Sequence, residues 1–343
     1  MSASSLPIAP QNRRIVFARR PEGMPTADCF RLETVPTEMP GPGQALVYNF
    51  YLSVDPYIRM RMEEKDSYAS VMKLGDVLVG RTVGRIAASN IDGYAPGDWV
   101  VGRLGWQDYS LAQAADLQKI DVQAAPPTAY LGALGSTGIT AWIGLMEFGK
   151  PKAGETVVVS AASGAVGSVV GQLAKIQGCR VVGIAGGPRK CEIVTSEFGF
   201  DACVDYRSPT FAQDLAAAVP QGIDIFYDNV GGPILDTVLP LLNNFARIPL
   251  CGLVSQYNAV EPYGVKHYRE FFNHRVTLRG FVLSDHKDLW PAASRDLAAA
   301  YAAGRLKHLE SIADGLENAP QAFIDMLKGS NVGKQLVRLR PEH

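Results

Sequence analysis

The stretch Glu155-Thr-Val-Val-Val-Ser160, followed by Ala161-Ala-Ser-Gly-Ala-Val-Gly167, decides the fold of this chain. Its first part is a short, continuous apolar strand, and its second part is a glycine-rich turn that opens a helix. A strand, such a turn and a helix in this order are the context of a dinucleotide-binding fingerprint. Gly164 lets the backbone approach a pyrophosphate, and Gly167 permits close packing of the helix on the strand. Because Ala162 replaces the first glycine of the usual pattern, a turn that binds nothing stays open as the alternative.

Further short apolar strands follow the fingerprint. They are expected at residues 180–185, 202–205, 223–227, 246–251 and 276–281, with helical segments between most of them, one at 189–198. Near-continuous apolar strands that alternate with helices are typical of a parallel sheet covered on both faces. We therefore predict the α/β class, with a Rossmann doubly wound parallel sheet.

The flanking parts of the chain have a different pattern. Residues 14–125 contain short strands interrupted by Gly and Pro, for example at 44–48, 74–87 and 98–101, which is typical of an antiparallel, barrel-like β domain. A helix near 319–327 and a strand at 335–339 are expected to return to that domain. The predicted domains are therefore 1–128 with 306–343, for the β-barrel, and 129–305, for the dinucleotide-binding sheet.

Composition excludes several classes of protein. The net charge is −1, so no long-range field recruits nucleic acid or anionic lipid. Residues 1–14 lack the apolar segment of a signal peptide, and no run approaches the roughly 18 apolar residues of a membrane helix. We therefore expect a cytoplasmic protein. The five Cys and five His are scattered, so neither a disulfide framework nor a metal site is expected.

The end of the second strand indicates the cofactor. NAD-binding folds typically place Asp or Glu there, about 20 residues after the fingerprint, to hold the ribose 2′-hydroxyl. Here the strand runs into Gly186-Gly187-Pro-Arg189-Lys190, without an acid. A basic pair attracts a 2′-phosphate, so NADP(H) is favoured over NAD(H). The alternative is a solvated helix start that happens to be basic. Tyr206, after the third strand, could reach the same phosphate or be a half-buried core residue.

Two later loops and one early segment are weaker signals. Residues 228–232 and 251–257 follow the fourth and fifth strands, and ligands in such folds lie at the carboxyl ends of strands. Each loop could equally be a simple glycine-rich turn. Tyr51-Leu-Ser-Val-Asp-Pro-Tyr-Ile-Arg59 mixes polar and aromatic residues, but aromatic packing and an Asp–Arg contact would explain it as well.

The residues quoted above, with Phe226-Tyr-Asp-Asn-Val-Gly-Gly232, Cys251-Gly-Leu-Val-Ser-Gln-Tyr-Asn258 and Lys328-Gly-Ser-Asn-Val-Gly-Lys334, resemble a known family nearly from end to end. The chain is similar to the zinc-free medium-chain dehydrogenase/reductase superfamily. Within it, the resemblance is to the NADPH-dependent double-bond reductases of the leukotriene B4 12-hydroxydehydrogenase/prostaglandin reductase group, and most of all to the bacterial curcumin reductases. The resemblance implies a GroES-like β domain, a homodimer and NADPH as the cofactor.

The resemblance also implies roles for individual residues. Tyr51 and Tyr257 would face the substrate and are the candidate catalytic residues. The candidate cofactor-binding residues are Ser163, Gly164, Ala165, Val166, Gly167, Gly187, Arg189, Lys190, Tyr206, Asn229, Cys251, Gly252, Ser255, Tyr257, Phe281, Val282, Leu283 and Asn331. Two segments depart from the family pattern. Trp142 is bulkier than the usual tyrosine, and the aromatic and basic segment 259–275 replaces a proline-rich loop, so these departures concern the substrate and not the cofactor.

The implied reaction is hydride transfer from NADPH to the β-carbon of an α,β-unsaturated ketone or aldehyde. Tyr257 or a ribose hydroxyl of the cofactor would meet the developing enolate charge, and Tyr51 or water would supply the proton. A quinone reductase and a non-catalytic NADPH-binding protein are the alternatives. A zinc alcohol dehydrogenase is disfavoured by the scattered Cys and His.

Overall fold

The computed structural model of the chain describes residues 8–64 and 70–341, and it divides into two compact units. The first unit comprises Met1–Leu131 and Glu310–His343, and the second comprises Gly132–Leu309. We predicted that residues 1–14 are not a signal peptide. Residues 1–7 of this segment lie outside the described residues. No helix among the described residues has the length and the apolar character needed to cross a membrane.

The second unit is built on a parallel sheet of six described strands. Its strand order is β10-β9-β8-β11-β12-β13, the order of a doubly wound dinucleotide fold. The strands are β8 (Thr156–Ser160), β9 (Arg180–Ala185), β10 (Ala202–Asp205), β11 (Ile223–Tyr227), β12 (Leu242–Leu250) and β13 (Thr277–Gly280). The predicted fold class is confirmed.

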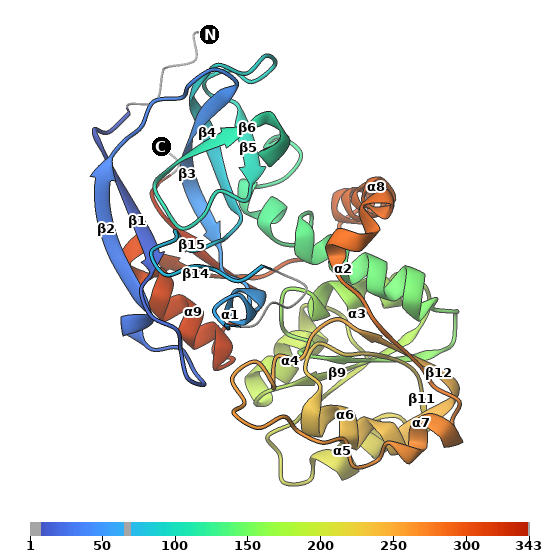
Figure 1. Cartoon of the computed structure of the whole chain (residues 1–343). Helices are drawn as coiled ribbons and strands as arrows, with labels where there is room; N and C mark the ends of the chain where they lie inside the picture. Colours follow the sequence, from blue (N-terminus) through green and yellow to red (C-terminus); the bar gives the residue numbers. More distant parts are fainter. Residues whose placement is uncertain (1–7, 65–69, 342–343) are drawn as a thin grey trace. The chain divides into compact units, whose positions relative to one another are not determined.

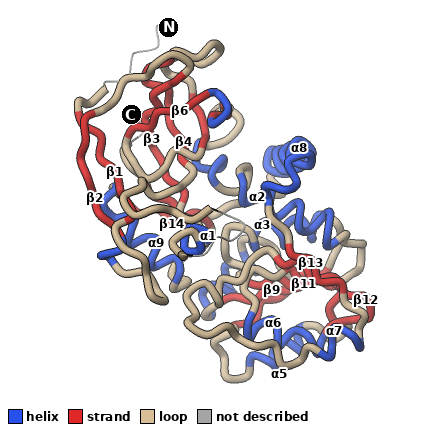
Figure 2. The backbone as a smooth tube through the Cα atoms, viewed as in Figure 1, coloured by secondary structure: helices blue, strands red, loops and turns tan. Residues whose placement is uncertain are grey.

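Helices cover both faces of this sheet (Figures 1 and 2). Val157 and Val159 of β8 pack into one apolar cluster, whereas Val158 packs into another, so consecutive side chains enter opposite faces. The helical segments of the unit are α2 (Ser136–Ile143), the π-helix η4 (Gly144–Gly149), α3 (Gly167–Ile176), α4 (Pro188–Ser196), α5 (Phe211–Ala218), α6 (Gly232–Val238), η5 (Leu239–Leu241), α7 (Arg269–Asn273), η6 (Leu283–Leu289) and α8 (Trp290–Ala302).

The first unit is mainly antiparallel. Its larger sheet has the order β14-β15-β3-β4-β5-β7, in which only the β14–β15 pair is parallel, and β6 also pairs with β3. A separate hairpin pairs β1 (Gln11–Phe17) with β2 (Phe30–Pro36). The other strands are β3 (Gln44–Ser53), β4 (Thr82–Ser89), β5 (Trp99–Gly102), β6 (Tyr109–Gln113), β7 (Leu117–Lys119), β14 (Glu310–Asp314) and β15 (Lys334–Arg338). The short helical segments are η1 (Ala27–Cys29), α1 (Tyr57–Met60), η2 (Ala114–Asp116), η3 (Pro127–Leu131), η7 (Leu316–Asn318) and α9 (Ala319–Leu327).

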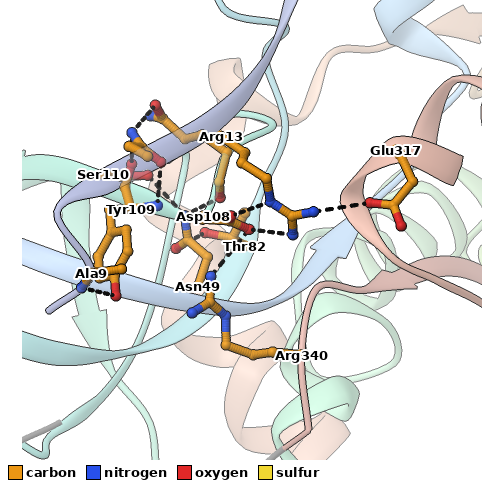
Figure 3. A network of polar contacts seen from close by, with 11 residues as sticks. Ala9, Arg13, Asn49, Thr82, Asp108, Tyr109, Ser110, Glu317 and Arg340 are labelled. Atoms are coloured by element: carbon orange, nitrogen blue, oxygen red, sulfur yellow. Dashed lines mark hydrogen bonds and ion pairs between the residues drawn. The ribbon is translucent and has the colours of Figure 1, made fainter. Parts of the chain in front are cut away.

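A polar network joins β1 to the segment after β15 (Figure 3). Arg13 of β1 donates to the Asp108 carboxylate over 2.8 Å, and Arg340, after β15, contacts the same carboxylate at 3.1 Å. The Arg340 guanidinium also lies over the Tyr48 ring. Residues that are distant in sequence therefore hold the C-terminal strand against the barrel.

The prediction of one strand at residues 74–87 is wrong in its first half, because β4 begins only at Thr82. Gly75 adopts a φ of +90°, and Lys73 and Asp76 close a turn around it, so the chain cannot run straight here. Val77 makes only an isolated bridge to Val16.

Candidate functional site

The carboxyl ends of the parallel strands meet at one edge of the second unit, and the turn after β8 lies at its centre. Ala161 leaves the strand with a φ of +50°, and α3 begins at Gly167. A Cβ at Gly167 would lie 2.4 Å from the Ala161 carbonyl oxygen, so only glycine lets the helix begin this close to the strand. A Cβ at Gly164 would lie 3.1 Å from the same oxygen. The turn thus has the geometry expected of the fingerprint, with an open helix N-terminus suited to an anion.

A cationic cluster lies beyond β9, where the sequence predicts a 2′-phosphate site. A Cβ at Gly186 would lie 2.9 Å from the Tyr206 ring and 3.1 Å from Arg207 Nε, so both side chains lie against this glycine. Burial lowers the pKa of the Lys190 ammonium, and the nearby Arg207 guanidinium lowers it further. Lys190, Tyr206 and Arg207 are therefore neighbours, which is the arrangement that would hold a phosphate.

Two residues at this cluster, Arg207 and Asp205, were not predicted from the sequence. Arg207 lies in the turn after β10 and was not considered. Asp205, the last residue of β10, is an acid beside the predicted phosphate site, but its Oδ1 accepts the N–H groups of Gly187 (2.8 Å) and Arg207 (2.9 Å). The carboxylate thus shapes the turn. Arg189, predicted to act with Lys190, lies exposed in the first turn of α4.

The turn after β11 is organised by a buried carboxylate. Asp228 accepts hydrogen bonds from Ser160 Oγ (2.9 Å) and from the N–H groups of Val230 and Gly231. Burial raises the pKa of Asp228, and these hydrogen bonds oppose the increase. Asn229 donates its side-chain amide to the Ser160 carbonyl over 2.8 Å, so β8 orients this candidate ligand.

The loop after β12 is tied to the turn after β11. Ser255 donates its hydroxyl to the Val230 carbonyl over 2.7 Å. The Tyr257 hydroxyl accepts the N–H of Leu253 over 3.3 Å and lies against Gly252, where a Cβ would be 3.1 Å away. Burial raises the pKa of Tyr257, and the Leu253 hydrogen bond opposes this. The phenol is therefore a protonated donor at neutral pH.

Cys251 and Phe281 lie deeper at the same edge. Burial raises the pKa of the Cys251 thiol to about 12, so it stays a neutral thiol. The Phe281 ring lies 5.2 Å from that of Phe148 and close to Gly144. Val282 and Leu283 follow it and are half-buried. Trp142, which departs from the family pattern, donates its indole N–H to Asp296 of α8 over 3.1 Å.

The divergent segment 259–275 is fixed to α6 by one acid. Asp236 accepts the Tyr263 hydroxyl (2.8 Å) and the N–H groups of Lys266 and His267. Burial raises the pKa of Asp236, but these donors outweigh it and hold the pKa below its usual value. Asp236 has no motif around it that would have predicted this role from the sequence.

Two candidate residues belong to the first unit. Tyr51 is 6% exposed in β3 and lines a cavity of about 560 Å³ together with Asp314, Arg338 and Arg340. Asn331 donates its side-chain amide to the Gly333 carbonyl over 2.9 Å, just before β15. Their proposed roles at substrate and cofactor remain predictions.

The edge of the second unit fits a phosphorylated dinucleotide. The glycine turn could receive the pyrophosphate, Lys190 and Arg207 the 2′-phosphate, and Asn229 with the loop 251–257 the ribose and nicotinamide. Within residues 8–64 and 70–341, no group of three or more His, Cys, Asp or Glu is arranged to hold a metal ion.

Comparison with known proteins relates the chain to oxidoreductases. Residues 13–120 match the family "N-terminal domain of oxidoreductase", and residues 165–299 match the family "Zinc-binding dehydrogenase". The chain is 47% identical over 335 residues to the NADPH-dependent curcumin reductase of Escherichia coli, which covers 96% of this chain and 97% of that protein. It is 38% identical over 340 residues to the NADP(+)-dependent 2-alkenal reductase of Nicotiana tabacum, covering 96% and 98%.

A solved structure shows the same similarity. CurA from Vibrio vulnificus in complex with NADPH superposes with a TM-score of 0.92 at 42% identity, and the match covers 96% of this chain and 99% of that one.

Proposed function

The chain belongs to the medium-chain dehydrogenase/reductase superfamily, and we propose that it is an NADPH-dependent reductase of carbon–carbon double bonds conjugated to a ketone or an aldehyde. The relatives named above are a curcumin reductase and a 2-alkenal reductase, both of which use this cofactor. The chain shares nearly its whole length with them.

The observation that carries the proposal is the cationic cluster beyond β9. Lys190 and Arg207 are close enough for the charge of Arg207 to lower the pKa of Lys190, after the larger effect of burial. A 2′-phosphate placed between them would relieve this repulsion and accept charge-assisted hydrogen bonds. NADH offers only a hydroxyl there and would leave the repulsion in place.

Two tyrosines of the chain, Tyr257 and Tyr51, are the proposed donors in the reduction of the enone. NADPH, when bound, supplies a hydride to the β-carbon of the enone. Negative charge then develops on the substrate's carbonyl oxygen, and a donor held in place beforehand stabilises it. The Tyr257 hydroxyl is such a donor, because it is protonated and anchored to its own loop. Tyr51 or water delivers the proton to the α-carbon.

The other proposed site residues bind the cofactor. Ser163, Gly164, Ala165, Val166 and Gly167 surround its pyrophosphate, and Gly187, Arg189, Lys190 and Tyr206 surround its 2′-phosphate. Asn229, Cys251, Gly252, Ser255, Phe281, Val282, Leu283 and Asn331 position its ribose and nicotinamide.

The test is an absorbance assay of NADPH oxidation with purified protein. We expect oxidation only when protein, NADPH and an enone or alkenal are all present, and little oxidation with NADH. Faster turnover of simple quinones than of any enone would make the protein a quinone reductase. Tight NADPH binding without turnover of any acceptor would make it a non-catalytic binding protein.

We also propose that the enzyme is a cytoplasmic homodimer that acts on small molecules and binds neither nucleic acid nor membrane. The near-zero net charge supports the absence of nucleic-acid binding. Subcellular fractionation with an antibody to the chain tests the location.

A further inference from the structure

Two thiols of the second unit lie side by side between α4 and β10. Cys191 belongs to α4, and Cys203, 12 positions later in the sequence, belongs to β10. The Cys203 thiol donates to Cys191 Sγ over 3.0 Å. Because a disulfide bond is about 2.05 Å long, the two sulfur atoms are about 1 Å from bonding distance. Both residues are half-buried, so a small solute has access to the pair.

The other cysteines are in a different state. Cys29 and Cys179 are buried, and the Cys179 thiol donates to the Lys152 carbonyl over 3.3 Å. Burial raises the pKa of the Cys179 thiol to about 11 and that of the Cys251 thiol to about 12. A thiol that is protonated at neutral pH is a weak nucleophile. Oxidation is therefore expected at the pair before it reaches Cys179 or Cys251.

The hydrogen bond between the two thiols makes them unequal. It lowers the pKa of the Cys191 thiol below its usual value, although burial and the Asp205 carboxylate oppose this. The same hydrogen bond, together with burial, raises the pKa of Cys203. Since the thiolate is the form that attacks, Cys191 is expected to react first and Cys203 second.

The pair lies next to the cationic cluster beyond β9. Lys190 directly precedes Cys191 in α4, and Arg207 lies in the turn that follows the strand of Cys203. Asp205 Oδ1 joins the two segments, because it accepts the N–H groups of Gly187 (2.8 Å) and Arg207 (2.9 Å). The segments that carry the sulfur atoms therefore also carry the candidate ligands of the 2′-phosphate. Drawing the sulfur atoms together by about 1 Å shifts these segments against each other, and a shift of that size misplaces a charged donor.

We propose that Cys191 and Cys203 are a redox-modification site: a hydroperoxide oxidises them to a reversible disulfide within the chain, and this bond weakens NADPH binding. The disulfide itself depends only on the position of the two thiols. Its effect on NADPH rests on the proposed function, because it requires the 2′-phosphate to bind at the cluster beyond β9.

The reaction proceeds in two balanced steps. Cys191 Sγ attacks one peroxide oxygen, an S–O bond forms, the O–O bond breaks, and the leaving hydroxide takes up a proton to become water. Cys203 Sγ then attacks the sulfenic acid of Cys191, the S–S bond forms, the S–O bond breaks, and the Cys203 proton leaves with the hydroxyl as a second water. The two thiols are oxidised by two electrons, and the peroxide is reduced to two waters. A dithiol reductant reverses the change.

The first experiment detects the bond by peptide mass. The full-length protein is treated with hydrogen peroxide, alkylated with iodoacetamide and digested with trypsin. No Lys or Arg lies between Lys190 and Arg207 except Arg207 itself, so both cysteines fall in the single peptide 191–207. We expect this peptide to lose two hydrogen atoms and to stay unalkylated, and dithiothreitol to restore two alkylated cysteines. Two alkylated cysteines after peroxide, or a cross-link to a second peptide, would overturn the inference.

Serine variants test the order of attack. Cys203→Ser should stop at the sulfenic acid of Cys191, which dimedone traps, whereas Cys191→Ser should give no dimedone adduct at Cys203. Cys179→Ser is the matched control and should still form the disulfide, since a serine hydroxyl can donate to the Lys152 carbonyl as the thiol does. Circular dichroism melting checks that each variant folds. An adduct at Cys203 but not at Cys191 would show that the assigned nucleophile is wrong.

A nucleotide titration tests the effect on the cofactor. Oxidation of the wild-type protein should weaken NADPH binding about 10-fold, as expected for a lost hydrogen bond to a charged group, and dithiothreitol should restore it. NADH binding should change less, and peroxide should not change NADPH binding in Cys191→Ser. Unchanged NADPH affinity in the disulfide form would disprove the regulatory effect. If the reduced protein binds no NADPH, the proposed function fails, and the mass of peptide 191–207 still decides whether the disulfide forms.

Discussion

Lys190 and Arg207 are the two residues at which the choice of cofactor can be tested. Each is expected to donate a charge-assisted hydrogen bond to the 2′-phosphate, so Lys190→Ala or Arg207→Ala should weaken NADPH binding about 10- to 100-fold. NADH lacks that phosphate, and its affinity should change little. Fluorescence titration with both nucleotides measures the difference. Lys175→Ala serves as the control, because that lysine pairs with Asp201 at 2.8 Å on the same unit. Equal losses for both nucleotides would contradict the assignment.

Replacing Tyr257 tests which group donates a hydrogen bond to the developing enolate oxygen. Tyr257→Phe removes the donor for the enolate oxygen and should lower kcat about 100-fold, the scale of general acid catalysis. Because burial raises the tyrosine pKa above its usual value of about 10, the active, protonated form persists through neutral pH. The wild-type kcat should therefore stay flat from neutral pH upwards and fall only when pH passes the raised pKa. Stopped-flow rates across pH give this profile. If the Tyr257→Phe variant keeps the wild-type kcat, the donor to the enolate oxygen is the ribose hydroxyl of the cofactor.

Part of the candidate site can be predicted by following the sequence from strand to strand. Lys190 and Tyr206, predicted to bind the same phosphate, both lie near Arg207, and their role as phosphate ligands stays a prediction. Arg207 and the bridging Asp205 were missed, because their roles depend on which strand lies beside β9. Distances along the sequence do not contain that information.

Among the elements, the β8–α3 turn leaves no room for a side chain at Gly167. Gly167→Ala would place a Cβ 2.4 Å from the Ala161 carbonyl oxygen, which is backbone and cannot rotate away. The start of α3 must then shift, at a cost of about 1–3 kcal/mol, and NADPH affinity should fall with it. Thermal melting and nucleotide titration measure the two effects. Gly164→Ala, whose Cβ would be 3.1 Å from the same oxygen, should cost less stability. A Gly167→Ala variant with unchanged melting and affinity would show that this turn is not tight.

The elements of the sheet were predictable where burial was complete. Strands β8, β9, β10 and β11 lie where the apolar runs predict them, because a strand covered on both faces needs an unbroken apolar sequence. β12 begins at Leu242, four residues before the expected start at 246. Its first half includes the polar residues Asn243 and Asn244, which interrupt the apolar run there. The register also shifts between Ile223 and Ile225, an irregularity that no sequence pattern indicates.

For the whole molecule, the edge strand β13 offers a test of the proposed homodimer. All four residues of β13 are exposed, Leu278 to 41%, although the strand continues a buried parallel sheet. An unpaired edge with an apolar side chain is a template for pairing with another chain. A second copy of this chain would satisfy it, because twofold symmetry brings the same edge of each copy together. We therefore expect a dimer of 37.0 kDa chains joined along β13.

Leu278→Lys should convert this dimer to monomers, since a lysine on an edge strand opposes pairing. Leu32→Lys is the matched control: Leu32 is a leucine of β2 that is 46% exposed, and its replacement should leave the dimer intact. Light scattering after size-exclusion chromatography gives the mass of each variant. A wild-type monomer would disprove the dimer. A Leu278→Lys protein that remains dimeric would place the interface elsewhere on the surface.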